Sequence, residues 1–136
     1  MGTIHDLVKD RTPYSVNADD SVMQAVHMMV DKNIGAVAVL RDGELVGVFS
    51  ERDLMKRVVA AGRGPGSTQV SEVMTPRPRT VSPNETFENC MFIMREHGFR
   101  HLPVVEAGQL FGLVSLRDLL LHAVDQTAGG RKQAAS

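Results

Sequence analysis

Apolar residues in the first half of the chain follow two different spacings, one after the other. From residue 22 they recur at the spacing of one buried helix face, at Val22, Ala25, Val26, Met29 and Val30. Asp19-Asp20-Ser21 precedes this helix as a cap, and Asn33 ends it. Residues 34–40 are then continuously apolar, which is typical of a buried strand. The pattern therefore predicts a helix followed by a strand.

A hairpin and a further helix follow this strand. Asp42-Gly43 is a two-residue turn signal, and residues 44–49 form the returning strand. Ser50 begins the next helix. Upstream, residues 13–16 form a short extended piece, and Thr3-Ile4-His5-Asp6 predicts a capping box with Thr3 as the cap.

The same pattern occurs a second time. Residues 44–54 and 109–119 match at an offset that holds without a gap from Val16/Val81 to Leu54/Leu119. Self-similarity at a fixed offset indicates one folding unit used twice. The second copy is predicted to have a strand at 80–81, a helix at 87–96, a hairpin of 102–106 with 110–114, and a helix from Ser115.

Each copy is therefore predicted to be β-α-β-β-α, which gives an α/β fold of two pseudo-twofold repeats packed into one module. A binding site is expected in the cleft between the copies. We assign repeat 1 to residues 3–62, a Gly/Pro/Ser-rich linker to 63–69, repeat 2 to 70–125, and a disordered tail to 126–136.

Composition narrows the function classes. The net charge of −1 gives no overall field toward nucleic acid or a membrane, and the single Cys90 fits a reducing compartment. We read no signal peptide and no membrane span, so we expect a cytoplasmic protein. The histidines show no metal-ligand spacing, and no catalytic set is evident, so we expect neither a metal site nor an enzyme.

Two related turns carry candidate chemistry: Ser50-Glu51-Arg52-Asp53 and Ser115-Leu116-Arg117-Asp118. Each serine lies where a strand ends and a helix begins, and a helix N-terminus favours an anion such as phosphate. The aspartate three residues on has two acceptor oxygens that match the vicinal hydroxyls of a ribose, and the arginine between them can reach phosphate. The alternative is plain helix capping, because Ser-x-x-Asp is a capping pattern. Repetition in matched context favours binding.

A second candidate is the Arg100-His101 pair, which follows Gly98-Phe99 and leads into a buried strand. Two potential cations at a cleft edge can neutralise a phosphate chain. The alternative is a surface arginine and a solvated histidine. Copy one has Gly35-Ala36 here and no cation, so we expect the two sites to differ.

These motifs resemble the tandem cystathionine-beta-synthase (CBS) domain, or Bateman module, of the stand-alone bacterial type. The resemblance covers roughly residues 3–124. It rests on Gly-Ala-Val-Ala-Val-Leu, Leu-Val-Gly-Val-Phe-Ser-Glu-Arg-Asp, Val-Ser-Glu-Val-Met-Thr-Pro, Arg-His-Leu-Pro-Val-Val and Leu-Phe-Gly-Leu-Val-Ser-Leu-Arg-Asp.

The resemblance implies a regulatory adenine nucleotide (AMP, ADP, ATP or NAD, and less readily S-adenosylmethionine) and no obligatory cofactor. Asp53 is implied to hold the ribose, and the backbone at Thr80 and Leu102 to frame adenine. The implied main site comprises Ser50, Arg52, Asp53, Thr75, Thr80, Arg100, His101 and Leu102. The implied second, weaker site comprises Ser15, Ala36, Val37, Ser115, Arg117 and Asp118. In that second site the counterpart of Thr75 is Lys9 or Asp10, and no cation matches Arg100 or His101.

The sequence thus predicts a non-catalytic nucleotide sensor that forms a homodimer through its repeat helices and is read by an effector protein. The first alternative is a structural or interaction scaffold that binds no nucleotide. A nucleic-acid-binding module is disfavoured by the balanced charge and by only one Tyr and five Phe. No membrane partner is expected.

Overall fold

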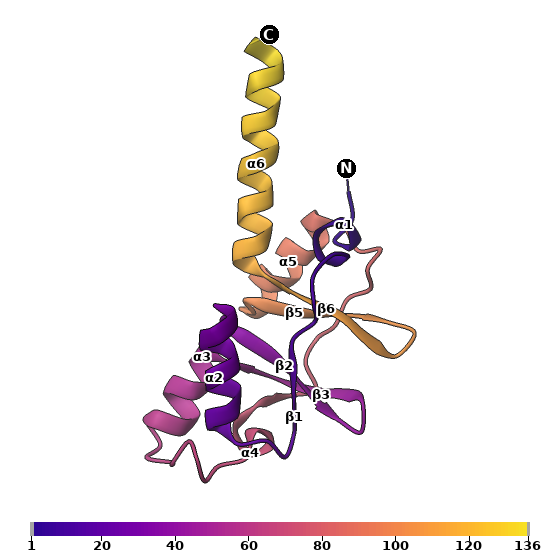
Figure 1. The fold of residues 1–136 in the computed structure, drawn as a ribbon. Coiled ribbons are helices and arrows are strands. Elements are labelled where there is room, and N and C mark those ends of the chain that lie inside the picture. The colour runs from indigo at the N-terminus through magenta and orange to yellow at the C-terminus, as the bar shows by residue number, and fades with distance from the viewer. Residues whose placement is uncertain (1, 136) are drawn as a thin grey trace.

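The computed structural model describes the backbone of residues 2–135 and the side chains of residues 2–125. Figure 1 shows its elements in space. In chain order they are α1 (His5–Val8), β1 (Ser15–Asn17), α2 (Val22–Lys32), β2 (Ala36–Arg41), β3 (Glu44–Ser50), α3 (Glu51–Asp53), the π-helix η1 (Leu54–Val59), α4 (Val70–Val73), β4 (Thr75–Pro76), α5 (Phe87–His97), β5 (His101–Glu106), β6 (Gln109–Ser115) and α6 (Leu116–Ala135).

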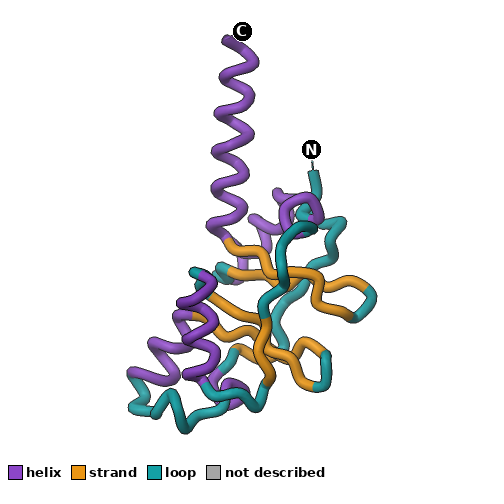
Figure 2. The backbone as a smooth tube through the Cα atoms, viewed as in Figure 1, coloured by secondary structure: helices purple, strands orange, loops and turns teal. Residues whose placement is uncertain are grey.

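The strand pairing repeats with the sequence. In the first repeat β1 runs parallel to β2, which pairs antiparallel with β3, and β4 completes a sheet in the order β1-β2-β3-β4. In the second repeat β5 and β6 form the matching hairpin, and Val81 adds a parallel bridge to Val104 where Val16 pairs with Val39. Figure 2 shows the strands of both repeats at the middle of the molecule, and β3 contacts β6 there. The predicted α/β fold of two related repeats is confirmed.

Both hairpins turn on the same two-residue geometry. Asp42 and Gly43 have φ values of 52° and 81°, and Ala107 and Gly108 have φ values of 51° and 77°. Positive φ at both central residues is the type I′ turn, whose twist matches that of antiparallel strands. The pairing register shifts after Val39 in one hairpin and at the equivalent place in the other. The repeat therefore extends to the irregularities of the sheet.

The caps of α2 and α5 follow the sequence. Ser21 accepts a hydrogen bond from Gln24 N–H and Gln24 reaches back, so a capping box begins α2, while Asn33 ends it in the left-handed conformation. Thr86 caps α5 by accepting a hydrogen bond from Asn89 N–H, without a reciprocal contact, and Gly98 ends α5 in the left-handed conformation. The two predicted helices at these positions are confirmed, with α5 ending one residue later than expected.

The predicted capping box at Thr3 is wrong. The short helix is present, but Ile4 is its N-cap residue, and that helix end has no side-chain cap. Thr3 instead pairs with Thr86, and the Ile4 N–H donates to Glu85 O at 2.9 Å. Pairing with the second repeat therefore fixes the start of α1. A local sequence pattern cannot predict this pairing, because the partner residues lie far away in the chain.

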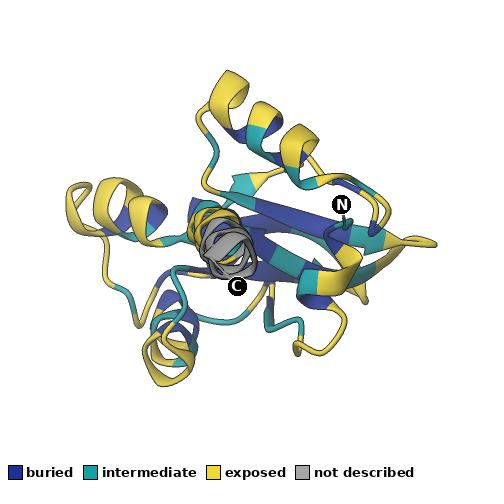
Figure 3. Cartoon of the chain, turned by 90° about the horizontal axis from the view of Figure 1, so that it is seen from above, coloured by how far each residue is buried: buried dark blue, intermediate teal, exposed yellow. Residues whose placement is uncertain are grey.

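The two hydrophobic cores exchange short segments. Val70 and Val73 of α4 pack into the core of the first repeat, around Phe49. Ile4 and Val8 pack into the core of the second repeat. Figure 3 shows the buried strands between helices whose outer faces are exposed. The core of each repeat is therefore completed by the first residues of the other repeat.

The last helix, α6, extends away from the rest of the molecule (Figure 1). Its backbone is helical to Ala135, over most of the range expected to be a disordered tail. The side chains of 126–136 lie outside the described residues, so the expectation for this tail stays a prediction. Within the part of the chain that the structure describes, no helix is long and apolar enough to cross a membrane.

Candidate functional site

A cleft of about 1210 Å³ lies between the two repeats. One wall comes from the N-terminal segment around Arg11 and Tyr14, and another from residues 33–36 and Glu51 of the first repeat. The second repeat contributes Arg100, His101 and the β6–α6 turn. The expected position of the site between the copies thus coincides with a real cavity.

The β6–α6 turn places a capped aspartate in this cleft. Asp118 N–H donates to Ser115 Oγ at 3.0 Å, and Ser115 N–H donates to Asp118 Oδ2 at 2.9 Å. Arg11 Nη1 also lies 2.9 Å from Asp118 Oδ2. Burial alone would raise the pKa of Asp118, but the hydrogen bonds and charge of Arg11 and the Ser115 amide lower it below its usual value. Asp118 is therefore an ionised acceptor on the cleft wall.

In the equivalent turn after β3, neighbouring side chains of the protein cover the aspartate. Asp53 is only 5 % exposed, and its Oδ2 accepts hydrogen bonds from Ser50 N–H at 2.9 Å and Ser50 Oγ at 3.1 Å. Thr75 Oγ1 donates to Asp53 Oδ1 at 3.1 Å, and Arg57 Nε lies 3.7 Å from the same oxygen. The capping interpretation of Ser-x-x-Asp is thus confirmed in both copies, but only Asp118 lines the cleft.

Arg100 and His101 lie beside the Asp118 turn because β5 and β6 are paired. His101 is the direct cross-strand partner of Ser115, and the Arg100 carbonyl accepts from Leu116 N–H at 2.8 Å. Burial lowers the pKa of His101, the carboxylates of Asp118 and Glu51 oppose this, and the Arg100 charge adds to it. The imidazole is therefore neutral near pH 7.

A missing side chain at Gly35 lets two polar groups approach. A Cβ atom at Gly35 would lie 2.6 Å from Glu51 Oε1 and 3.6 Å from His101 Nε2. The Gly35 carbonyl accepts from Glu51 N–H at 3.0 Å, as the Arg100 carbonyl does in the other repeat. The packing of the two repeats thus places an acid from the first repeat and an imidazole from the second close to Gly35.

The sequence-predicted site residues fall into four groups. Ser50, Asp53 and Thr75 form the closed network after β3. Val37 and Leu102 are fully buried core residues, and Ser15, Arg52 and Thr80 do not line the cleft. The cleft itself holds Ala36, Arg100, His101, Ser115, Arg117 and Asp118. Arg100 and His101 thus lie beside the Ser115–Asp118 turn of their own repeat. The sequence instead groups them with Ser50 and Asp53 of the first repeat.

The family profile of the CBS domain matches residues 4–60 and 70–125. The chain belongs to the CBS-domain family.

Its relatives include small proteins with the same two repeats. It is 34 % identical over 130 residues to the CBS domain-containing protein YhcV of Bacillus subtilis, covering 96 % of this chain and 91 % of YhcV. A solved CBS-domain protein from Burkholderia ambifaria MC40-6 is 37 % identical, with a TM-score of 0.85 and coverage of 90 % and 94 % of the two chains. CBSX2, solved in complex with AMP, is 28 % identical, with a TM-score of 0.76 and coverage of 93 % and 99 %.

Arg11 and Glu51 are charged cleft residues of this CBS pair that the sequence does not assign to either site. The sequence makes Lys9 or Asp10 the counterpart of Thr75, because the register slips by one residue there, but in the structure Arg11 contacts Asp118 as Thr75 contacts Asp53. Glu51 was visible as an acid beside Ser50, yet its approach to His101 depends on the packing of the two repeats.

The described residues contain no group of three or more His, Cys, Asp or Glu side chains that could hold a metal ion. Cys90 is buried, and burial together with the charge of Glu85 raises the pKa of its thiol to about 11. The thiol is therefore protonated at neutral pH and a poor nucleophile.

Proposed function

We propose that this CBS pair is a non-catalytic regulatory module that binds an adenine nucleotide in the cleft between its repeats. The observation that carries the proposal is the meeting, in one cavity, of the ionised Asp118 with Arg100, His101 and the amide end of α6. A carboxylate suits the ribose hydroxyls, and guanidinium groups suit phosphate. The AMP complex of CBSX2 supports AMP as the first ligand to test.

Binding would use the residues of the cleft in separate roles. Asp118 accepts from the two ribose hydroxyls, while Ser115 and Arg117 face the phosphate near the helix N-terminus. Arg100 supplies further charge from the start of β5. Because the walls come from both repeats, the ligand couples their relative positions. Such a ligand regulates a partner protein only if it binds two arrangements of the repeats with unequal affinity.

A homodimer is the assembly we propose for reading this change. Large apolar side chains are exposed on the helices of both repeats, including Met23 and Val30 on α2, Met55 and Val59 on η1, and Phe92 on α5. An apolar groove of about 460 Å³ beside α5 is lined by Met91, Phe92 and Phe99 among others. Exposed apolar helix faces of this kind support self-association through the repeat helices.

A scaffold that binds no nucleotide is the competing function. Its specific support is that both aspartates already have partners, Thr75 at Asp53 and Arg11 at Asp118. On that view the two Ser-x-x-Asp turns only cap helices, and the repeats serve as a rigid interaction surface.

A thermal-shift titration with AMP, ATP, NAD and S-adenosylmethionine separates the two functions. A ligand at about 100 times its dissociation constant adds about 2.7 kcal/mol of stability, which is an easily measured shift. We expect one adenine nucleotide to raise the melting temperature of the wild type and of Asp53→Asn, but not of Asp118→Asn. If ligand-free, folded wild-type protein responds to none of the four, the sensor function is refuted. A loss of response in Asp53→Asn alone would move the site to the β3 turn.

A further inference from the structure

The two equivalent aspartates are held by chemically different partners. Asp53 accepts a hydrogen bond from the neutral hydroxyl of Thr75 at 3.1 Å in a nearly closed environment, and the Arg57 guanidinium lies farther off, 3.7 Å from the same oxygen. Asp118 is paired instead with the guanidinium of Arg11, and the side chains of this pair are 44 % and 21 % exposed. The second contact is therefore an ion pair at the edge of the cleft, within reach of an incoming ligand.

The backbone at Arg11 is held by a hydrogen bond to the core segment, so only the Arg11 side chain would need to move to exchange partners. Arg11 N–H donates to Val8 O at 3.0 Å, and Val8 is 1 % exposed in the core of the second repeat. Ion pairs exposed to this degree contribute little net stability, because water solvates both charges. A ligand can therefore take the place of Arg11 on Asp118 at small cost, but the released guanidinium then needs an anion or water.

The cleft gives no overall charge that would select an anion by itself. Its charged lining comprises three guanidinium groups and three carboxylates: Arg11, Arg100, Arg117, Asp10, Glu51 and Asp118. Recognition of phosphate must then depend on individual contacts rather than on a net field. An arginine that exchanges one anionic partner for another is such a contact.

We infer that Arg11 is a specificity-determining residue of the cleft that holds Asp118 while the cleft is empty and transfers to the ligand phosphate when a ribose takes Asp118. This inference rests on the proposed function and adds to it the discrimination of nucleotides from nucleosides. A nucleotide replaces the ion pair with an equivalent one. A nucleoside breaks the pair and offers Arg11 nothing in return, so Arg11 opposes its binding.

Calorimetric titration of AMP and of adenosine into the full chain tests this exchange. In Arg11→Gln we expect AMP affinity to fall about tenfold, the loss of one charge-assisted hydrogen bond. We expect adenosine affinity to stay the same or to rise by up to about fivefold, because Asp118 is then free. Arg11→Lys keeps a charge and should retain most of the preference for AMP.

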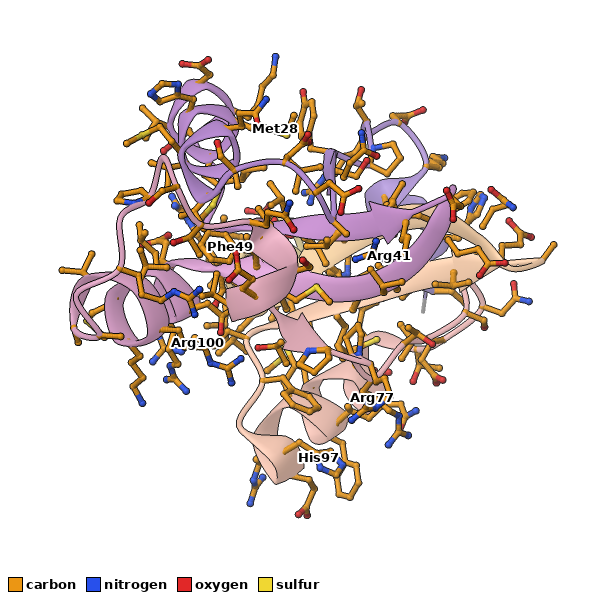
Figure 4. All side chains as sticks on the ribbon, turned by 90° about the horizontal axis from the view of Figure 1, so that it is seen from below. Met28, Arg41, Phe49, Arg77, His97 and Arg100 are labelled. Carbon is orange, nitrogen blue, oxygen red and sulfur yellow. The ribbon has the colours of Figure 1, made fainter. Side chains whose placement is uncertain are left out.

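The matched control is Arg41→Gln. Arg41 forms a similar exposed ion pair with Asp19, 3.4 Å apart, and lies well apart from Arg100 (Figure 4). It should change neither affinity, and the melting temperature of each unliganded variant verifies folding.

Two results would overturn the inference alone. One is an equal weakening of AMP and adenosine binding in Arg11→Gln, which would make Arg11 only a support for Asp118. The other is no change in either. A folded wild type that binds neither compound would instead remove the proposed function, and the inference with it.

Discussion

At the scale of single residues, the two Ser-x-x-Asp turns share one backbone geometry and differ in what covers the carboxylate. The paired amide contacts of Ser50 with Asp53 recur in Ser115 with Asp118. Thr75 comes from β4 and seals the first turn, whereas Arg11 comes from a loop and leaves the second turn accessible. The two repeats thus share both turns but hold one closed and one more accessible acceptor.

His101 makes stability depend on pH in a predictable direction. Burial lowers its pKa below 6.5, so between the folded and unfolded pKa values the unfolded chain binds more protons. Stability therefore falls as the pH drops below about 6.5, the unfolded value for histidine. Asp118, whose pKa is also lowered, adds a loss of stability only at more acidic pH, as its carboxylate is protonated.

Urea denaturation of the wild type and of His101→Gln between pH 8 and pH 5 measures this effect. We expect the variant to show a shallower loss of stability on acidification. The free energies of unfolding at pH 8 measure the effect of the substitution on packing alone, because the imidazole is neutral at that pH in both the folded and the unfolded state. Identical pH slopes for the two proteins would show that His101 does not titrate in the way its burial requires.

At the scale of elements, the sequence was most informative where structure is local. The cap of α2 and the two hairpins depend on residues within a few positions of one another, and all three are predicted by the sequence. The two-residue strand β4 and the N-cap of α1 depend on partners far away in the chain, and neither was predicted. The same division explains the site. Ser115 and Asp118 are neighbours in sequence, whereas Arg11 reaches them only through the fold.

Strand β3 approaches β4 too closely for any side chain at Gly47. A Cβ atom there would collide with Met74 Sδ and lie 2.9 Å from the Thr75 carbonyl oxygen. At the equivalent Gly112 the neighbour is the Val8 side chain, at 3.0 Å and beyond. We expect Gly47→Ala to lower the free energy of unfolding by about 1–3 kcal/mol, because backbone must shift. Gly112→Ala should cost less.

Chemical denaturation of both variants beside Gly66→Ala measures the difference. Gly66 has no atom within 4 Å of its Cβ position, so this control should stay close to the wild type. Equal stabilities for Gly47→Ala and Gly66→Ala would mean that β4 yields freely, and that Thr75 is not held firmly against Asp53.

At the scale of the whole molecule, each repeat depends on a segment supplied from outside its own strand–helix–hairpin unit. Ile4 and Val8 lie in the core of the second repeat, while Val70 and Val73 lie in the core of the first. The chain therefore links the two repeats by crossing from one core to the other. The wall of the cleft that carries Arg11 follows directly from α1 and is fixed by the same exchange.

This exchange predicts that core substitutions act at a distance in sequence. Ile4 is fully buried, and truncating such a side chain to alanine costs about 2–5 kcal/mol. We expect Ile4→Ala to speed amide hydrogen exchange in β5 and β6, about a hundred residues away, more than in β2 and β3. Val70→Ala, in a fully buried position of the other core, should produce the opposite pattern. Because the two variants remove comparable groups, each serves as the control for the other.

If both variants accelerate exchange equally throughout the chain, the repeats unfold as one cooperative unit, and nucleotide in the cleft would act on the whole module at once. If each acts on its own core, the cleft lies between two separable units, which is the arrangement that a ligand contacting both walls can regulate.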